Sequence, residues 1–182
     1  DGKLSRGLGD VYKRQHIADV HIRNLKRHKE YREVFSQLYG HILSTMGKND
    51  IIYIAGDIVH AKTDMSPEVV DLTQEFFCKL ADLLPTIVIP GNHDANLNNT
   101  SRLDALSPII SALDHENIYY LKDTGGYGIG GYTFVHKSIW DKSEGFPSAK
   151  GFKENNGRIA VFHGPVDNLS LIHISEPTRQ LA

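Results

Sequence analysis

The chain has 182 residues, a length typical of one domain, and its 40% hydrophobic and 23% charged residues are typical of a folded globular protein. Its single cysteine, Cys78, excludes a disulfide scaffold, and the net charge of −2 excludes a strongly basic nucleic-acid binder. No apolar run is long enough to span a bilayer, and no segment has the pattern of a secretory signal. We therefore expect a cytoplasmic protein without a membrane segment, or one in the host-cell cytoplasm if the source is viral.

The two ends of the chain are related through the DNA that would encode them. Residues 5–15 read SRGLGDVYKRQ and residues 169–179 read LSLIHISEPTR. The reverse complement of one DNA sequence that encodes the first segment translates into the second without a mismatch. Such DNA resembles a transposase adapter used in sequencing-library preparation. We therefore expect residues 1–15 and 169–182 to be adapter-derived tails, and residues 16–168 to be the genuine domain, truncated at both ends.

Short apolar strands alternate with amphipathic helices along residues 16–168. The strands are predicted at residues 16–20, 51–55, 86–89, 118–121, 132–136 and 158–162. The helices are predicted at residues 26–46, from Ser66 and Pro67 onwards, and at residues 106–113. Glycine pairs at residues 125–126 and 130–131 are expected to interrupt the regular secondary structure. This alternation predicts an α/β fold in which crossover helices connect the strands of a sheet.

Polar side chains follow four of the predicted strands. They are Asp19 and His21, then Asp57 and His60, then Asn92, His93 and Asp94, and finally His163. Because the carboxyl ends of parallel strands meet at one edge of a sheet, we expect these side chains to lie close together. Carboxylates, an amide and imidazoles suit manganese, iron or zinc, and a bridging carboxylate holds two ions ~3.5–4 Å apart.

Each of these residues also has an ordinary structural interpretation. An isolated aspartate after a strand is usually a turn or cap residue, and an isolated histidine is usually a surface or core residue. We apply that interpretation to His28, His41, His115 and His136, and we expect Cys78 to be a core residue. For the four polar clusters together the metal site is favoured, because strand ends and ligand types coincide four times.

The four clusters resemble a known signature. Asp19-Val-His21, Gly56-Asp57, Gly91-Asn92-His93-Asp94 and His163 resemble the motifs of the calcineurin-like metallophosphoesterases, whose fold is a sandwich of β-sheet layers flanked by helices. The segments HIADVHIRN, GDIVHAKTDMSPE, GNHDANLNNTSRLDAL and VFHGPVDN look like the SbcD-type nucleases of DNA double-strand-break repair, in a viral or phage-like branch. The resemblance therefore implies a metal-dependent nuclease that hydrolyses the phosphodiester bonds of DNA.

The resemblance implies two divalent ions, with Mn²⁺ preferred and Mg²⁺ or Fe²⁺ as alternatives. Asp19 and His21 would hold the first ion, Asp57 would bridge both ions, and Asn92 and His163 would hold the second.

The remaining motif residues would act on the substrate. His93 would protonate or stabilise the leaving oxygen, and Asp94 would orient His93. His60 would orient the nucleic acid. Arg102 would contact a backbone phosphate or lie on a helix surface.

The family pattern continues beyond the part found here. A Gly-x-x-His or Gly-His-x-His block would follow His163, whereas His173 falls in a predicted tail. The cap domain that contacts DNA and the segment that binds the partner ATPase would also lie downstream. We therefore expect weak metal binding and little activity from the 182-residue chain itself. The partners implied for the intact protein are DNA, an SbcC-like SMC-type ATPase and a second copy in a homodimer.

Two other functions stay open at this point. The first is a phosphatase or nucleotide phosphodiesterase of the same superfamily, since the metal-binding loops would be shared. The second is a non-catalytic remnant that keeps only the scaffold. The DNA assignment rests on the resemblance, because the sequence lacks the lysine and arginine stripe of a stand-alone duplex binder.

Overall fold

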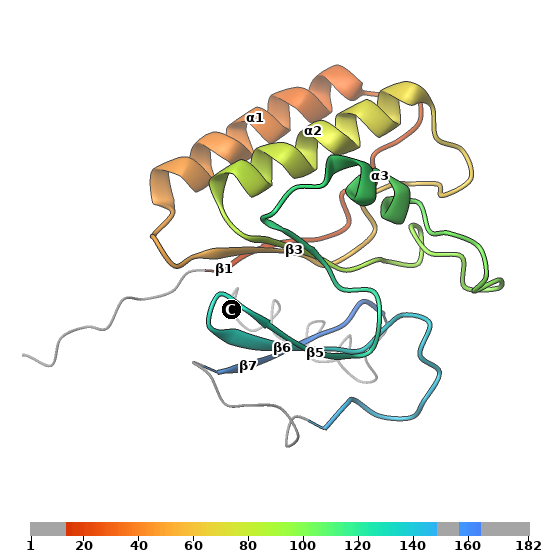
Figure 1. The fold of residues 1–182 in the computed structure, drawn as a ribbon. Helices are drawn as coiled ribbons and strands as arrows, with labels where there is room; N and C mark the ends of the chain where they lie inside the picture. The colour runs from red at the N-terminus through yellow and green to blue at the C-terminus, as the bar shows by residue number, and fades with distance from the viewer. Residues whose placement is uncertain (1–13, 149–156, 165–182) are drawn as a thin grey trace, which may run out of the picture.

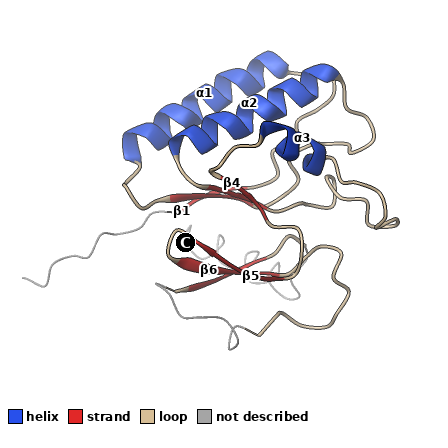
Figure 2. Cartoon of the chain, in the orientation of Figure 1, coloured by secondary structure: helices blue, strands red, loops and turns tan. Residues whose placement is uncertain are grey.

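The computed structural model describes residues 14–148 and 157–164, which form two β-sheets and three helices (Figures 1 and 2). The first sheet is parallel, with its strands in sequence order. Its strands are β1 (Arg14–Ile17), β2 (Ile51–Ile54), β3 (Thr86–Val88) and β4 (Ile118–Tyr120). The connecting helices are α1 (His28–Thr45), α2 (Pro67–Leu83) and α3 (Leu106–Leu113). Crossovers of one preferred hand place all three helices on the same face of this sheet, as Figure 1 shows.

The second sheet covers the other face of the first (Figure 1). Its strands are β5 (Gly125–Ile129), β6 (Tyr132–His136) and β7 (Arg158–Val161), with β5 antiparallel and β7 parallel to β6. Apolar side chains fill the space between the sheets, including Ile51 and Ile87 from the first and Phe134 and Val161 from the second. The prediction of an α/β sandwich with helices is therefore confirmed.

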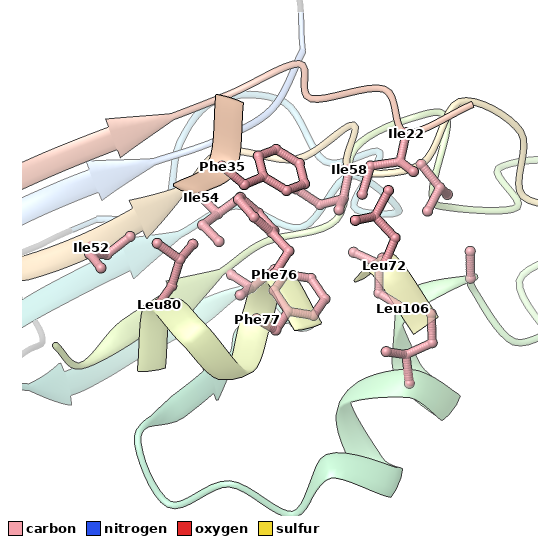
Figure 3. Close-up of a cluster of buried hydrophobic side chains, with 14 of the residues drawn as sticks. Ile22, Phe35, Ile52, Ile54, Ile58, Leu72, Phe76, Phe77, Leu80 and Leu106 are labelled. Carbon is pink, nitrogen blue, oxygen red and sulfur yellow. The ribbon is translucent and has the colours of Figure 1, made fainter. Parts of the chain in front are cut away.

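A second apolar core lies between the parallel sheet and the helices (Figure 3). Phe35 of α1 packs on Phe76 of α2 with a ring-centroid distance of 4.3 Å. Ile52 and Ile54 point from the sheet into the same cluster and are fully buried. Burying side chains of this size contributes about 1.5–3 kcal/mol each. This core fixes the helices on the sheet and so fixes the loops between them.

The first strand differs from its prediction at both ends. It spans Arg14–Ile17, so it begins within the residues predicted to be a tail and ends before Asp19. Asp19 and His21 have φ angles of 55° and 49°, which are incompatible with a strand. The strand prediction over residues 16–20 was therefore wrong in extent, because hydrogen bonds to a neighbouring loop impose a left-handed backbone there.

In the glycine-rich region the first glycine pair was predicted wrongly, whereas the second pair does interrupt the strands. Residues 125–129 form β5 rather than an irregular segment, because they pair along their whole length with β6. Gly130 and Gly131 have φ angles of 57° and 81°, which form the tight turn of this hairpin. The later strands consequently form a second sheet, whereas the prediction placed all the polar clusters at the edge of one.

The predicted tails lie mostly outside the described residues. Among the residues that the structure describes, no helix is long and apolar enough to cross a membrane.

Candidate metal centre

The loops that follow β1 and β2 run side by side and are joined through their backbones. The N–H of His21 donates to the carbonyl oxygen of Asp57 (2.9 Å), and the N–H of Ile22 donates to that of Ile58 (2.8 Å). The N–H of Asp19 donates to the carbonyl oxygen of Gly56 (3.3 Å). These bonds continue the pairing of β1 with β2 beyond the sheet. They place Asp19 and His21 beside Asp57.

Asp94 joins the loop after β2 to the loop after β3. Its fully buried carboxylate accepts hydrogen bonds from the N–H groups of Ile58 (3.0 Å), Val59 (3.0 Å) and Gly91 (2.9 Å). Burial raises the pKa of Asp94 to about 6, although these three bonds oppose the rise.

Asp94 reaches His93 through the backbone of its loop and not through the ring. The carboxylate of Asp94 is used by three backbone N–H groups, and the ring of His93 has a different partner. His93 Nδ1 lies 2.7 Å from the carbonyl oxygen of His60. Asp94 therefore positions the loop that carries His93, and His60 holds the ring.

Asp57 lies at the centre of the polar clusters. Its side chain is buried, and its Oδ1 accepts a hydrogen bond from the N–H of His93 (2.9 Å). Its Oδ2 lies 3.7 Å from Nε2 of His21 and 3.4 Å from Nε2 of His163. One carboxylate oxygen thus faces imidazoles from two different sheets.

Two groups of potential ligands share Asp57. In the first, one ligand atom each from Asp19, His21 and Asp57 lies within 4.8 Å of the others. In the second, Nε2 of His163 lies 3.2 Å from Oδ1 of Asn92 in addition to its approach to Asp57. Nδ1 of His163 lies 2.6 Å from the carbonyl oxygen of Ala55. If Nδ1 carries the proton and donates it to this oxygen, Nε2 is free to bind a metal ion.

Two glycines permit this close approach. Gly56 has a φ of +89°, and a Cβ there would lie 2.7 Å from Nδ1 of His163. A Cβ on Gly91 would overlap with Oδ1 of Asp57. Both positions therefore require the residue without a side chain.

The donor set fits divalent metal ions. Carboxylates, imidazoles and an amide oxygen converge, which matches ions of borderline hardness. Nδ1 of His21 is buried and has no hydrogen-bond partner among the described residues. An imidazole left incompletely paired beside two carboxylates is consistent with a ring that is held for a ligand.

Comparison with known proteins decides the family. The profile of the calcineurin-like phosphoesterases matches residues 15–181. The chain belongs to this family. An uncharacterized protein of Acanthamoeba polyphaga mimivirus is 44% identical over 162 residues, covering 84% of this chain and 12% of that protein. Calcineurin-like phosphoesterases bind divalent metals and hydrolyse phosphoesters, so the Asp and His groups around Asp57 form the candidate metal centre of this one.

Two further histidines lie beside the metal centre of this calcineurin-like phosphoesterase. His93 contacts His21 with a ring-centroid distance of 4.6 Å, and the rings of His60 and His93 stack at 5.7 Å. Partial desolvation lowers the pKa of His60, and the positive charge of Arg23 adds to this effect. His60 is therefore held towards its neutral form.

The structure does not bring Arg102 to the described metal centre. Arg102 is exposed before α3, and its described hydrogen bond joins its backbone to Asn99. Lys62 was missed by the sequence analysis, although its Nζ donates to the carbonyl oxygen of Asn92 (3.0 Å). Arg23 and Lys26 also act on His60 through their charges. The signal for these cations was their position within a few residues of a motif histidine.

Proposed function

We propose that this protein is a two-metal nuclease that hydrolyses the phosphodiester bonds of DNA in recombination and double-strand-break repair. The observation that carries the proposal is the position of Asp57, whose carboxylate belongs to both ligand groups. A shared carboxylate is the arrangement expected for two ions ~3.5–4 Å apart. The reaction class follows from the family, and DNA as substrate is supported by the resemblance of the motifs to SbcD-type nucleases.

In this proposal Asp19, His21 and Asp57 hold one ion, and Asp57, Asn92 and His163 hold the other. When bound, such ions polarise a phosphodiester and supply a water nucleophile at neutral pH; Mn²⁺ is our first choice. Burial of Asp57 removes competing water from its carboxylate. The backbone N–H of His93 then fixes Oδ1, so that the orientation of the carboxylate is set before any ion binds.

His93 is the proposed general acid. If Nδ1 carries the proton shared with the carbonyl oxygen of His60, Nε2 points away from that bond and is free to carry a second proton. Donation from Nε2 to the departing sugar oxygen would contribute about 10²–10⁴-fold to the rate. His60 thus acts on the reaction through the ring of His93 as well as through its own side chain.

A small group of positively charged side chains supports a long polyanion, rather than a small phosphoester, as the substrate. Arg23 and Lys26 lie close enough to His60 for their charges to lower its pKa, and the ammonium group of Lys62 is bonded to the backbone of Asn92. They would contact phosphates that flank the reacting one, as the positioning contacts of nucleic-acid-binding proteins do. The resemblance further implies an SbcC-like ATPase and a second copy of the protein as partners, which we include in the proposal.

The experiment that tests this function compares substrates. The domain, expressed with the downstream residues predicted above, is given linear duplex DNA and p-nitrophenyl phosphate esters in the presence of Mn²⁺. We expect Mn²⁺-dependent cleavage of DNA, lost in the Asp57→Asn variant. Hydrolysis of the small esters without DNA cleavage would instead support a phosphatase. Absence of both activities in a protein that binds Mn²⁺ would support a non-catalytic remnant.

A further inference from the structure

Three imidazoles form a cluster that contains no carboxylate. His21, His60 and His93 come from the loops after β1, β2 and β3, and one ligand nitrogen from each lies within 4.8 Å of the other two. The three ring centroids are 4.6–5.7 Å apart. His60 is exposed and the other two are partly exposed, so an ion can reach the cluster from solvent.

The backbone fixes these three residues relative to one another. The N–H of His60 donates to the carbonyl oxygen of Ile22 (3.0 Å), next to His21. The ring of His93 is hydrogen-bonded through Nδ1 to the carbonyl oxygen of His60 (2.7 Å). A histidine that donates one ring N–H to a carbonyl presents its other nitrogen as a ligand, which is the usual arrangement at metal sites. The backbone therefore holds the three residues close together, and the ring of His93 is already oriented by a hydrogen bond.

The ring of His21 has one nitrogen to spare. Its Nε2 faces Asp19 and Asp57, at 3.9 Å and 3.7 Å. Its Nδ1 is buried and has no hydrogen-bond partner among the described residues. This second observation is independent of the spacing of the cluster. The ring of His21 thus lies between the carboxylates of Asp19 and Asp57 and the other two imidazoles.

We propose that His21, His60 and His93 form an all-imidazole site for Zn²⁺ that overlaps the carboxylate group at His21. Zn²⁺ binds three imidazoles and a water at Zn–N distances of about 2.0–2.1 Å, which sets neighbouring nitrogens about 3.3 Å apart in a tetrahedron. Because the present spacing is at most 4.8 Å, each nitrogen would move by no more than about 1 Å to reach the tetrahedral arrangement. Mn²⁺ prefers the carboxylate-containing groups and binds nitrogen ligands more weakly than Zn²⁺.

Zinc at this site would inhibit the enzyme. It would occupy Nε2 of His93, the nitrogen from which the proton would be donated, and it would compete for the ring of His21. This consequence rests on the proposed function, whereas the binding of Zn²⁺ by the three rings does not.

The test uses Co²⁺ as a coloured substitute for Zn²⁺ with the 182-residue chain. Tetrahedral Co²⁺ absorbs visible light strongly, and Zn²⁺ should displace it with loss of the bands. We expect His60→Ala to remove the bands and to weaken Zn²⁺ binding at least about tenfold in calorimetric titration. His93→Gln should do the same, which guards against misfolding of a single variant. His41→Ala, on the exposed face of α1, is the matched control and should leave the bands unchanged.

The carboxylate variant Asp19→Asn separates the two sites. We expect it to keep the Co²⁺ bands and to lose one of the two Mn²⁺ ions, as counted by electron paramagnetic resonance. Bands that survive His60→Ala but disappear in Asp19→Asn would overturn the zinc site. Failure of the wild-type chain to bind Mn²⁺ even at millimolar concentration, with the cobalt bands present, would count against the proposed function and leave the zinc site supported.

Discussion

Asp57 and His163 follow strands of different sheets, yet Oδ2 of Asp57 lies 3.4 Å from Nε2 of His163. Asp57 follows β2 of the parallel sheet, and His163 follows β7 of the other sheet. The second ligand group therefore exists only when the two sheets are packed together. Their apolar interface, which includes Ile87 and Phe134, is a structural requirement of the metal centre.

Truncation of Phe134 should consequently affect both stability and metal binding. Phe134 is almost completely buried between the sheets. We expect Phe134→Ala to lower the free energy of unfolding by about 3–5 kcal/mol, measured by urea denaturation. We also expect weaker binding of the second Mn²⁺ ion. Leu43→Ala, at an exposed position of α1, should change neither quantity appreciably.

Because both ligand groups share the Asp57 carboxylate, Asp57→Asn and Asp19→Asn should bind different numbers of Mn²⁺ ions. Asp57→Asn should lose both Mn²⁺ ions, because its side chain belongs to both ligand groups. Asp19→Asn should lose one ion and keep the group formed by Asn92 and His163. Calorimetric titration of the wild type and both variants at high Mn²⁺ concentration measures the difference. Equal losses in both variants would contradict the role of Asp57 as a bridge.

Much of this site could be predicted from the sequence, because its residues directly follow apolar segments with strand character. The positions of Asp57, Asn92 and His93 at strand ends needed only that pattern and the α/β alternation. The sheet to which each strand belongs could not be predicted. Strand periodicity reports which side chains are buried, and it does not report the pairing partner, so β7 and His163 were placed in the wrong sheet.

Other features depend on contacts between distant segments. The positive φ angles of Asp19, His21 and Asp57 are stabilised by hydrogen bonds between loops, which no local propensity reveals. The resemblance implied that Asp94 orients His93, but it did not identify the hydrogen-bond partners of Asp94, which include the N–H groups of Ile58 and Val59. Sequence proximity was a poor guide wherever a buried carboxylate had to satisfy backbone groups of another loop.

The two glycine positions provide a direct test of close packing at the centre. In Gly91→Ala the new Cβ would overlap with Oδ1 of Asp57, and this carboxylate is buried and unable to move freely. We expect loss of Mn²⁺ binding together with lower stability. Gly40→Ala, in α1 with open space around the new Cβ, should raise stability by up to about 1 kcal/mol. Unfolding midpoints and metal titrations of both variants make the comparison.

The positively charged side chain of Lys62, beside the metal centre, should make a salt-dependent contribution to DNA binding. Lys62 is held next to Asn92 through the backbone carbonyl of that residue, so its charge is fixed near the reacting phosphate in the proposed function. We expect Lys62→Met to weaken binding for all DNA sequences alike and to reduce the slope of log K against log salt by about 1. Lys48→Met, at an exposed position before β2 and so at the end of that strand opposite Asp57, should have no such effect. Fluorescence anisotropy over a range of salt concentrations measures both slopes.

The stability of the protein at acid pH should depend on Asp104, which lies two residues before the start of α3. Burial alone would raise the pKa of Asp104, but hydrogen bonds from Ser107, Lys122 and Tyr120 lower it below its ordinary value of 3.8. The folded protein therefore binds this proton more weakly than the unfolded chain. The resulting stability is fully present above pH ~4 and is lost as the pH falls through the lowered pKa.

The Asp104→Asn variant isolates that contribution. It should be less stable than the wild type by about 1–3 kcal/mol at pH 7, because Lys122 loses its ion pair and the α3 N–H groups lose a charged acceptor. The difference should shrink as the pH is lowered below ~4, since protonation then removes the same charge from the wild type. Urea denaturation at pH 7 and pH 3 measures it, and a difference that stays constant between the two would show that the charge of Asp104 contributes nothing.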